Sequence, residues 1–411
     1  MPNLALALTL SASLLSPISQ PVPVSPRDGH RVLDTSLTLR KGVVRSIVAG
    51  NVRIEDESMI RTIPLSEVAA IVPPTWGHAG APREPTDLAV WKTLPFEGEI
   101  TGVLRTTSGE VVPGHLASSP SHGGSEAPLA WESATIGRME VALDLVRSVS
   151  LSASVPPATT DSFADVLTLI NGDRLEGFVT QISQSVTVDG SEAPIPIERI
   201  ALIDLANPST PVAEPMVWCR DGTVLKTASI AWNEDAGLTL ERGSARITLR
   251  DIHLRSINVI PSRLIPLSAL PSPTWSAPQT RRWTPQPISE AATASIGASP
   301  IRLPGPGTAV WLLPASPVRF AATLELPADC RAWGNPSITI AVRKSGEMVV
   351  KSEPLWTGSL DGGSPVTSVN VEIAAPSGSD LELLITVAHG ARGTIQSELS
   401  ILDAVILTDA P

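Results

Sequence analysis

Residues that could support catalysis are few and scattered in this sequence. The chain has six histidines, and none of them stands at an HxH, HExxH or other ligand spacing from a Cys, Asp or Glu. The motifs GxSxG and GxxxxGK[ST], and GxGxxG after a strand, do not occur. Carboxylate pairs such as Glu55-Asp56 and Glu234-Asp235 fall between apolar runs, which is typical of solvated loop tips. We therefore expect a protein that is not an enzyme.

The aromatic residues offer binding chemistry instead. The chain has no Tyr, four Phe and ten Trp. A flat indole can cover the apolar face of a sugar ring, but Trp is also the largest core residue. Trp131 and Trp232 precede apolar repeats and are expected in a core, whereas Trp333 and Trp356 flank the turn-like segments RAWGNP and PLWTGSLDGG. The latter two are the candidates for contact with a ligand.

Composition favours an all-β protein of several domains. A chain of 411 residues is too long for one ordinary core, and 17% charged residues with 39 prolines suit short strands better than long helices. The net charge of −11 provides no basic surface for nucleic acid or anionic lipid. Cys219 and Cys330 are the only cysteines and fall in different expected domains, so both are expected to be small core residues.

The first 25 residues have the length and composition of a signal peptide. An apolar run from Leu4 to Leu15 is followed by small and Pro-rich residues, although no Lys or Arg precedes Arg27. An apolar first strand or a misassigned start codon are the alternatives. No later stretch has the length of a membrane span. We expect export to the periplasm, the cell surface or the medium.

A hairpin pattern occurs three times in the middle of the chain. Residues 166–182, VLTLINGDRLEGFVTQI, alternate apolar and polar side chains on both sides of Asn171-Gly172. The same pattern surrounds Ser108-Gly109 and Asp221-Gly222. These dipeptides provide positive φ at low cost, which predicts a β-hairpin at each of them.

The register of the hairpin at Gly172 can be predicted from the alternation. A strict two-residue turn would leave Leu175 on the wrong face of the strand. A three-residue loop, or a bulge at Asp173, places Leu169 opposite Leu175 and Leu167 opposite Gly177.

A second pattern follows each hairpin, with apolar residues at steps of two, three and three. A step of two predicts a strand, and steps of three fit a 3₁₀ turn before a closing strand. In the fourth copy the pattern ends early, because Arg255 stands where the last apolar residue is expected. The copies are Ile63, Leu65, Val68, Ile71; Val141, Leu143, Val146, Val149; Ile195, Ile197, Ile200, Ile203; and Ile247, Leu249, Ile252.

This order of elements resembles the small SH3-like or Sm-like β-barrels. The resemblance implies tandem barrels that share a core, because one such unit buries little apolar surface alone. It covers residues 34–74, a degenerate copy, and residues 96–153, 162–207 and 215–260.

Two further segments complete the chain. Residues 261–300 are rich in Pro and Ser with little periodicity, which predicts a linker. Residues 301–411 contain seven strand candidates separated by Gly and Pro turns, which predicts a β-sandwich. The segments ITIAVRKSGEMVVKSEPLWTG, VTSVNVEIAAPSGSDLELLITVAHGARG and SELSILDAVIL resemble the NPCBM family of carbohydrate-binding modules, sandwiches of jelly-roll type.

The resemblance to these modules implies a ligand and a site. It suggests that Trp333 and Trp356 contact a sugar, while Asp329, Glu353 and Asp361 accept its hydroxyl groups or hold a calcium ion. No other cofactor is expected.

Two functional hypotheses follow. In the first, the chain is an exported, non-catalytic binding protein whose sandwich contacts a polysaccharide or another cell-envelope component. In the second, it is an envelope scaffold whose β-repeats bind other proteins through strand edges.

Overall fold

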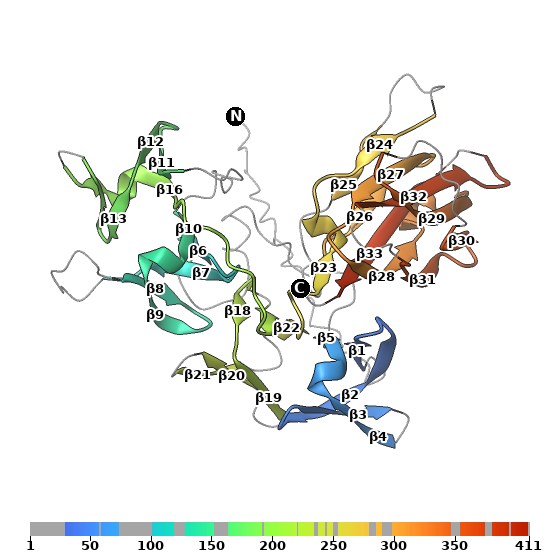
Figure 1. Cartoon of the computed structure of the whole chain (residues 1–411), viewed down its shortest axis with the longest axis horizontal. Coiled ribbons are helices and arrows are strands. Elements are labelled where there is room, and N and C mark those ends of the chain that lie inside the picture. The colour runs from blue at the N-terminus through green and yellow to red at the C-terminus, as the bar shows by residue number, and fades with distance from the viewer. Residues whose placement is uncertain are drawn as a thin grey trace, which may run out of the picture.

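The computed structural model confirms an all-β fold (Figure 1). Its described residues form strands joined by turns and short 3₁₀ segments, and no helix among them is long and apolar enough to cross a membrane. The predicted signal peptide, residues 1–25, lies outside the described part of the chain. The structure describes residues 29–56, 59–73, 101–118, 128–151, 163–190, 193–219, 221–233, 237–242, 245–249, 254–278, 285–289, 298–346, 354–374, 380–393 and 396–409.

Four similar β-units make up the first part of the molecule. Unit 1 contains β1 (His30–Asp34), β2 (Leu39–Val48), β3 (Asn51–Asp56), β4 (Met59–Pro64), the 3₁₀ turn η1 (Leu65–Glu67) and β5 (Val68–Val72). Unit 2 contains β6 (Gly102–Thr106), β7 (Val111–Leu116), β8 (Leu129–Ser133), β9 (Gly137–Val141), η2 (Leu143–Leu145) and β10 (Val146–Ser150).

Units 3 and 4 have a similar order, but each has one more strand, and no 3₁₀ turn is present among the described residues of unit 4. Unit 3 contains β11 (Asp165–Leu169), β12 (Arg174–Gly177), β13 (Val179–Ile182), β14 (Ser185–Val188), β15 (Ile195–Pro196), η3 (Ile197–Arg199) and β16 (Ile200–Asp204). Unit 4 contains β17 (Met216–Cys219), β18 (Val224–Lys226), β19 (Ser229–Asn233), β20 (Gly237–Arg242), β21 (Ala245–Leu249) and β22 (Leu254–Asn258). In every unit the last strand pairs antiparallel with the first.

The predicted hairpins are present, and each has a three-residue loop. Gly109, Gly172 and Gly222 all have positive φ, at 77°, 92° and 80°. The predicted strand partners were wrong by two residues, because Leu167 pairs with Leu175. The loop closes through the hydrogen bond from Leu169 N to Asp173 O. Leu175 therefore lies opposite a residue two positions closer to the start of β11 than predicted. It is 40% exposed.

Unit 1 has the same hairpin with a different residue at the turn. Leu37 occupies the position of the turn glycine, with φ of 56°, and its amide donates to Asp34 O. The expected start of this repeat at residue 34 therefore came too late, since β1 begins at His30. A Leu in a position that favours Gly hid the hairpin from the pattern.

The 3₁₀ turns lie where the apolar steps predicted them in three units, at η1, η2 and η3. For unit 4 the predicted register was wrong. Strand β22 places Ile257 opposite Val217, and Leu249, Leu254 and Ile257 are the buried residues of the pattern. The fourth copy thus begins two residues later than Ile247, and Arg255 is a buried neighbour of the pattern, not a break in it.

The units form a row in the order 3, 2, 4, 1, which Figure 1 shows as an arc from β11 to β1. Units 3 and 2 join through β16 and β10, units 2 and 4 through β18 and β7, and units 4 and 1 through β22 and β5. One cluster of buried hydrophobic residues extends through all four units, and it includes Trp131 and Trp232. Both tryptophans, and both free cysteines, are buried as expected.

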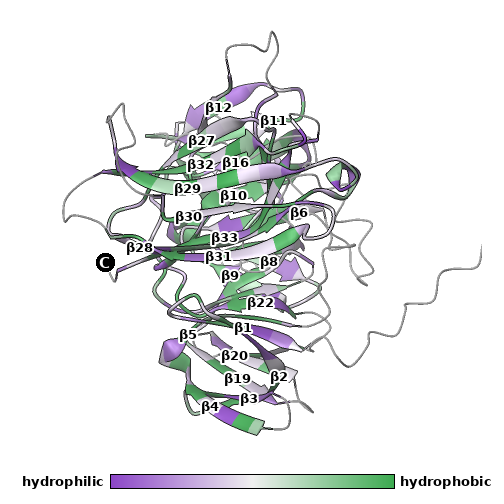
Figure 2. Ribbon diagram, turned by 90° about the vertical axis from the view of Figure 1, so that its right-hand side faces the viewer, coloured by the Kyte–Doolittle hydropathy of each residue, from purple (hydrophilic) through white to green (hydrophobic). Residues whose placement is uncertain are grey.

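The last part of the molecule is a two-sheet sandwich. Figure 2 shows it facing the viewer, with hydrophobic residues along strands such as β29. One sheet has β25 (Ile288–Ser289), β26 (Ile301–Leu303), β33 (Leu399–Thr408), β28 (Pro317–Glu325) and β31 (Val366–Glu372), with β23 (Leu264–Pro266) beside β33. The other has β24 (Thr274–Ser276), β27 (Gly307–Leu312), β32 (Leu381–His389), β29 (Pro336–Lys344) and β30 (Trp356–Ser359).

Residues 261–300 were predicted to be a linker, and the structure corrects this. Strands β23, β24 and β25 from this segment pair with β33, β27 and β26, so the segment contributes to both sheets. These strands are two or three residues long, which is too short to produce a visible apolar period.

Candidate functional site

Three loops meet at one end of the sandwich, and we call them the loop end. They are the η7 turn region (327–335), the β30–β31 loop (360–365) and the described parts of the β32–β33 loop (390–393 and 396–398); η7 itself is Ala328–Cys330. Asn335 joins all three. Its Oδ1 accepts a hydrogen bond from Ala391 N at 3.1 Å, and its Nδ2 lies 3.5 Å from Leu360 O as a donor.

Trp333 stands exposed on the first of these loops. The residue is 64% exposed, while its backbone N–H donates to Gln396 Oε1 at 3.0 Å. Gly334 packs closely beneath, since a Cβ there would lie 2.6 Å from both Cys330 O and Gln396 O. The indole therefore projects from a backbone that hydrogen bonds and close packing hold in place.

The charged groups beside this turn are mutually paired. Arg302 on β26 donates to Asp329 Oδ2 at 3.0 Å and to Glu398 Oε2 at 2.6 Å. The hydrogen bond from Arg302 holds the pKa of Asp329 below its usual value. One guanidinium thus balances two carboxylates, and Asp329 is ionised and engaged near neutral pH.

The other predicted site residues have different surroundings. Asp361 lies at the loop end, where its Oδ1 accepts the backbone N–H groups of Gly363 and Ser364, each at 2.8 Å. Trp356 is half-buried on β30, where its ring packs over Gly358 and against the sandwich core. Glu353 lies outside the described residues. The structure therefore brings Trp333, Asp329 and Asp361 to one end and places Trp356 further along an edge strand.

Three residues of the loop end were not predicted. Arg302, Asn335 and Gln396 come from segments far apart in the sequence, and none belongs to a residue class that signals a site by itself. Within the described residues, no group of three or more His, Cys, Asp or Glu side chains converges as a metal site would require. The chemistry available is stacking on an indole plus hydrogen bonds from amide, guanidinium and carboxylate groups.

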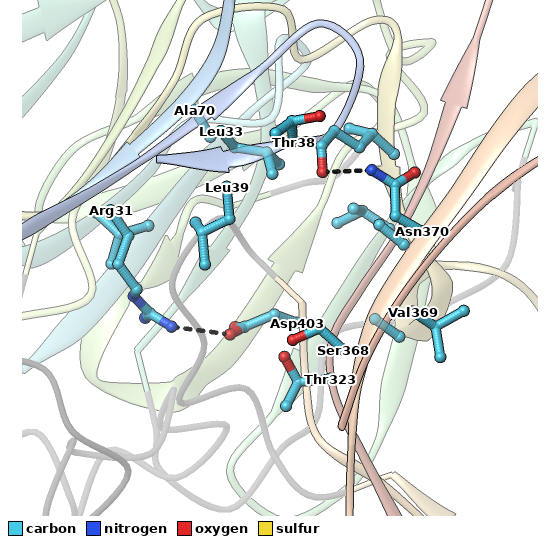
Figure 3. A pocket seen from close by; sticks show the side chains of 15 residues that line it. Arg31, Leu33, Thr38, Leu39, Ala70, Thr323, Ser368, Val369, Asn370 and Asp403 are labelled. Carbon is cyan, nitrogen blue, oxygen red and sulfur yellow. Dashed lines mark hydrogen bonds and ion pairs between the residues drawn. The ribbon is translucent and has the colours of Figure 1, made fainter. Parts of the chain in front are cut away.

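A pocket lies between unit 1 and the sandwich (Figure 3). This pocket of about 220 Å³ has mainly apolar walls, formed by residues such as Leu33 and Leu39 on one side and Val369 on the other. An ion pair between Arg31 and Asp403, with 3.3 Å between Nη1 and Oδ2, spans it. We call the contact around this pocket the joint.

Two residues of the joint adopt backbone conformations that favour glycine. Leu37 has φ of 56° and is 3% exposed in an apolar cluster shared with sandwich residues. Asp403 has φ of 49° at a bulge in β33. Asn370 Nδ2 donates to Ser36 O and Leu37 O, at 3.2 and 3.0 Å. Strained residues persist where surrounding contacts hold them, so the joint is a specific contact.

The turn at the joint depends on the ionised carboxylate of Asp34. Burial raises the pKa of Asp34, but hydrogen bonds from Ser36, Thr38 and Arg40 outweigh burial and leave the pKa below its usual value. A depressed folded-state pKa stabilises the protein above the unfolded pKa, and the contribution disappears as the pH falls through the folded value. Replacing Asp34 with Asn should therefore lower the free energy of unfolding by about 1 kcal/mol at pH 6.

Urea denaturation of Asp34→Asn and the parent chain at pH 6 and pH 3 measures this effect. The difference between the two proteins should shrink toward the lower pH. A difference that stays constant or grows on acidification would contradict the role assigned to the carboxylate.

The described part of the chain thus combines a row of β-units with a two-sheet sandwich. No protein-family model and no curated protein matches it. The solved structures to which it is similar include carbohydrate-binding modules. One is CBM51 from Clostridium perfringens GH95 in complex with methyl-galactose, at 16% identity, covering 35% of this chain and 99% of that chain, with a TM-score of 0.26.

Two further similarities are of the same kind. The structure of CBM51-2 and INT domains from Clostridium perfringens ZmpB has 10% identity, covers 42% of this chain and 36% of that chain, and has a TM-score of 0.28. CsCBM6-3 from Clostridium stercorarium in complex with cellobiose has 10% identity, covers 36% of this chain and 93% of that chain, and has a TM-score of 0.21.

Proposed function

We propose that this protein is a non-catalytic carbohydrate-binding protein whose loop end contacts a polysaccharide or glycoconjugate. The observation that carries the proposal is Trp333, a tryptophan 64% exposed on a turn that is fixed from beneath. An exposed indole has a cost in water, and stacking on the apolar face of a sugar ring offsets it. Because the turn is already ordered, little conformational entropy is lost when the ligand binds.

The charges of the loop end indicate the class of sugar. Arg302 is engaged by two carboxylates and Arg331 by Glu325, which leaves Arg392, exposed on the β32–β33 loop, as the one unpaired arginine among the described residues of the loop end. A neutral or weakly charged sugar fits best. In this proposal no cofactor is required, the export signal is residues 1–25, and the SH3-like row of units is a spacer that holds the sandwich away from its attachment point.

Calorimetric titration of the full chain with a panel of glycans tests the proposal. The panel contains methyl-galactose, N-acetylglucosamine, cello-oligosaccharides and xylo-oligosaccharides, each with and without calcium. Trp333→Ala should weaken binding by about tenfold or more, since aromatic contacts of this kind dominate binding energies. The matched control is Leu312→Ala, a hydrophobic residue 56% exposed on β27, which should bind normally.

Two outcomes would overturn the proposal. One is the absence of any affinity tighter than millimolar across the panel. The other is unchanged binding by Trp333→Ala. A requirement for calcium would retain the sugar site and correct the statement that no cofactor is needed.

A scaffold function is the second candidate, and one observation favours it. Strand β4 in unit 1 exposes Met59 and Ile60, at 60% and 55%, and it pairs only with β3 among the described residues. An open edge with apolar side chains can accept a strand from another protein. Loss of a protein partner on Ile60→Lys, with glycan binding unaffected, would support this function instead.

A further inference from the structure

The contacts between units join equivalent positions of the repeat. Val149 pairs with Ile203, and Ile71 pairs with Ile257, and these four residues are the last members of the same apolar pattern. Antiparallel pairing of equivalent residues places a local twofold axis at each contact. We call this the closing-strand contact, and it joins units 2 and 3 and units 4 and 1.

The contact between units 2 and 4 follows the same rule at a different strand. Val111 pairs with Val224, and each lies two residues after its turn glycine, Gly109 or Gly222. This is the hairpin contact. The two kinds of contact alternate along the row. Each unit therefore has two surfaces for its neighbours: a closing-strand face, formed by its last strand, and a hairpin face, formed by its second strand.

The hairpin faces of units 2 and 4 are covered, and that of unit 1 is covered in part. Those of units 2 and 4 cover each other, and Lys226 N additionally donates to the buried Glu110 at 3.1 Å. The equivalent face of unit 1 adjoins the sandwich at its turn, where Leu37 is buried, while Leu39, which lines the joint pocket, stays 47% exposed. The hairpin face of unit 3 differs in that, among the described residues, neither another unit nor the sandwich pairs with its strand.

That face of unit 3 consists of β12 and its flanking loops. Strand β12 pairs with β11 on one side and with no other described strand, and three of its four residues are exposed. Its equivalents β7 and β18 contain no exposed residue. The surface includes three exposed hydrophobic residues: Ile170 at 68%, Leu175 at 40% and Phe178 at 60%.

We propose that a second copy of this chain covers the free hairpin face, through antiparallel pairing of β12 with β12 about a twofold axis at Leu175. The partner strand then continues the alternation of contacts seen along the row. Pairing centred on Leu175 places the two Leu175 side chains opposite each other and each Arg174 opposite the Glu176 of the other copy. Opposite charges facing across paired strands stabilise a sheet, and like charges destabilise it.

The charge pattern also selects the register. Pairing centred on Arg174, the position equivalent to Val111 and Val224, would bring two arginines face to face. A shift to Leu175 removes this repulsion while keeping the same side chains on the same face. The protein is therefore a symmetric dimer with a sandwich at each distant end of the joined rows.

Sedimentation velocity of the full chain over a range of concentrations tests the dimer. Arg174→Glu and Glu176→Arg should each weaken dimerisation by about tenfold or more, because like charges then meet at two places. The double variant with both changes should dimerise like the parent chain, and an equimolar mixture of the two single variants should form a heterodimer. Arg61→Glu, an exposed arginine on the edge strand β4, is the control.

A cross-link tests the axis. Leu175→Cys should form a disulfide-linked dimer on mild oxidation, since the native cysteines are both buried, and Met59→Cys should not. A parent chain that stays monomeric at every concentration overturns the proposal. Dimerisation that Arg174→Glu leaves unchanged, with a melting temperature equal to that of the parent, also overturns it. Neither result bears on glycan binding at the loop end.

Discussion

Replacing Trp131 with alanine should lower the free energy of unfolding by about 3 to 5 kcal/mol, the range for deleting a large aromatic side chain from a core. Trp131 is fully buried in unit 2, and its Nε1 donates to Val112 O at 3.1 Å. The backbones of Gly102 and Gly114 pack so closely on the ring that a Cβ at either would lie within about 3 Å of it. Because this backbone is held by neighbouring strands, the space left by the ring cannot collapse easily.

Urea denaturation followed by circular dichroism measures this change. Trp333→Ala is the matched control, since the same substitution on an exposed side chain should alter stability by no more than about 0.5 kcal/mol. A loss below about 1 kcal/mol for Trp131→Ala would show that the residue is not a core residue.

Substitutions at Leu37 should have the second largest effect and an unusual order. Leu37→Ala removes a buried side chain from the joint and leaves a Cβ in the left-handed region, so we expect a loss of about 2 to 4 kcal/mol. Leu37→Gly loses the same burial but relieves backbone strain of about 1 to 2 kcal/mol. Glycine should therefore be less destabilising than alanine, the reverse of the usual order in a strand or helix.

Denaturation of the two variants, with small-angle scattering to detect separation of the sandwich from unit 1, measures this effect. At Gly50, where φ is already 72° with open space around the Cβ position, replacement by alanine should cost only the strain. An alanine variant at Leu37 more stable than the glycine variant would contradict the strained conformation.

Local features of the fold could be predicted from the sequence. The turns at Gly109, Gly172 and Gly222 and the 3₁₀ segments in units 1 to 3 follow from residue types and spacing within a few positions. The short strands of residues 261–300 could not be predicted, because their stability comes from sandwich strands that follow them in the chain. The conformation of Leu37 could not be predicted for the same reason, since contacts with distant residues such as Asn370 stabilise it.

The candidate site could be predicted in residue type but not in arrangement. The turn-like sequence around Trp333 indicated an exposed indole, and the structure places it so. The similar sequence around Trp356 gave no sign that its ring packs on Gly358. The pairing of Asp329 with Arg302 was also not predictable, because it depends on how η7 packs beside β26.

The order of units in the row also sets the timing of assembly during synthesis. Strand β5 leaves the ribosome early, yet its partner β22 comes much later, as the pairing of Ile71 with Ile257 requires. At about 5 to 20 residues per second, the interval is on the order of ten to forty seconds. During it β5, with the sequence VAAIV, presents an apolar open edge that favours aggregation. Until unit 4 is complete, this edge of β5 is open to pairing with another chain.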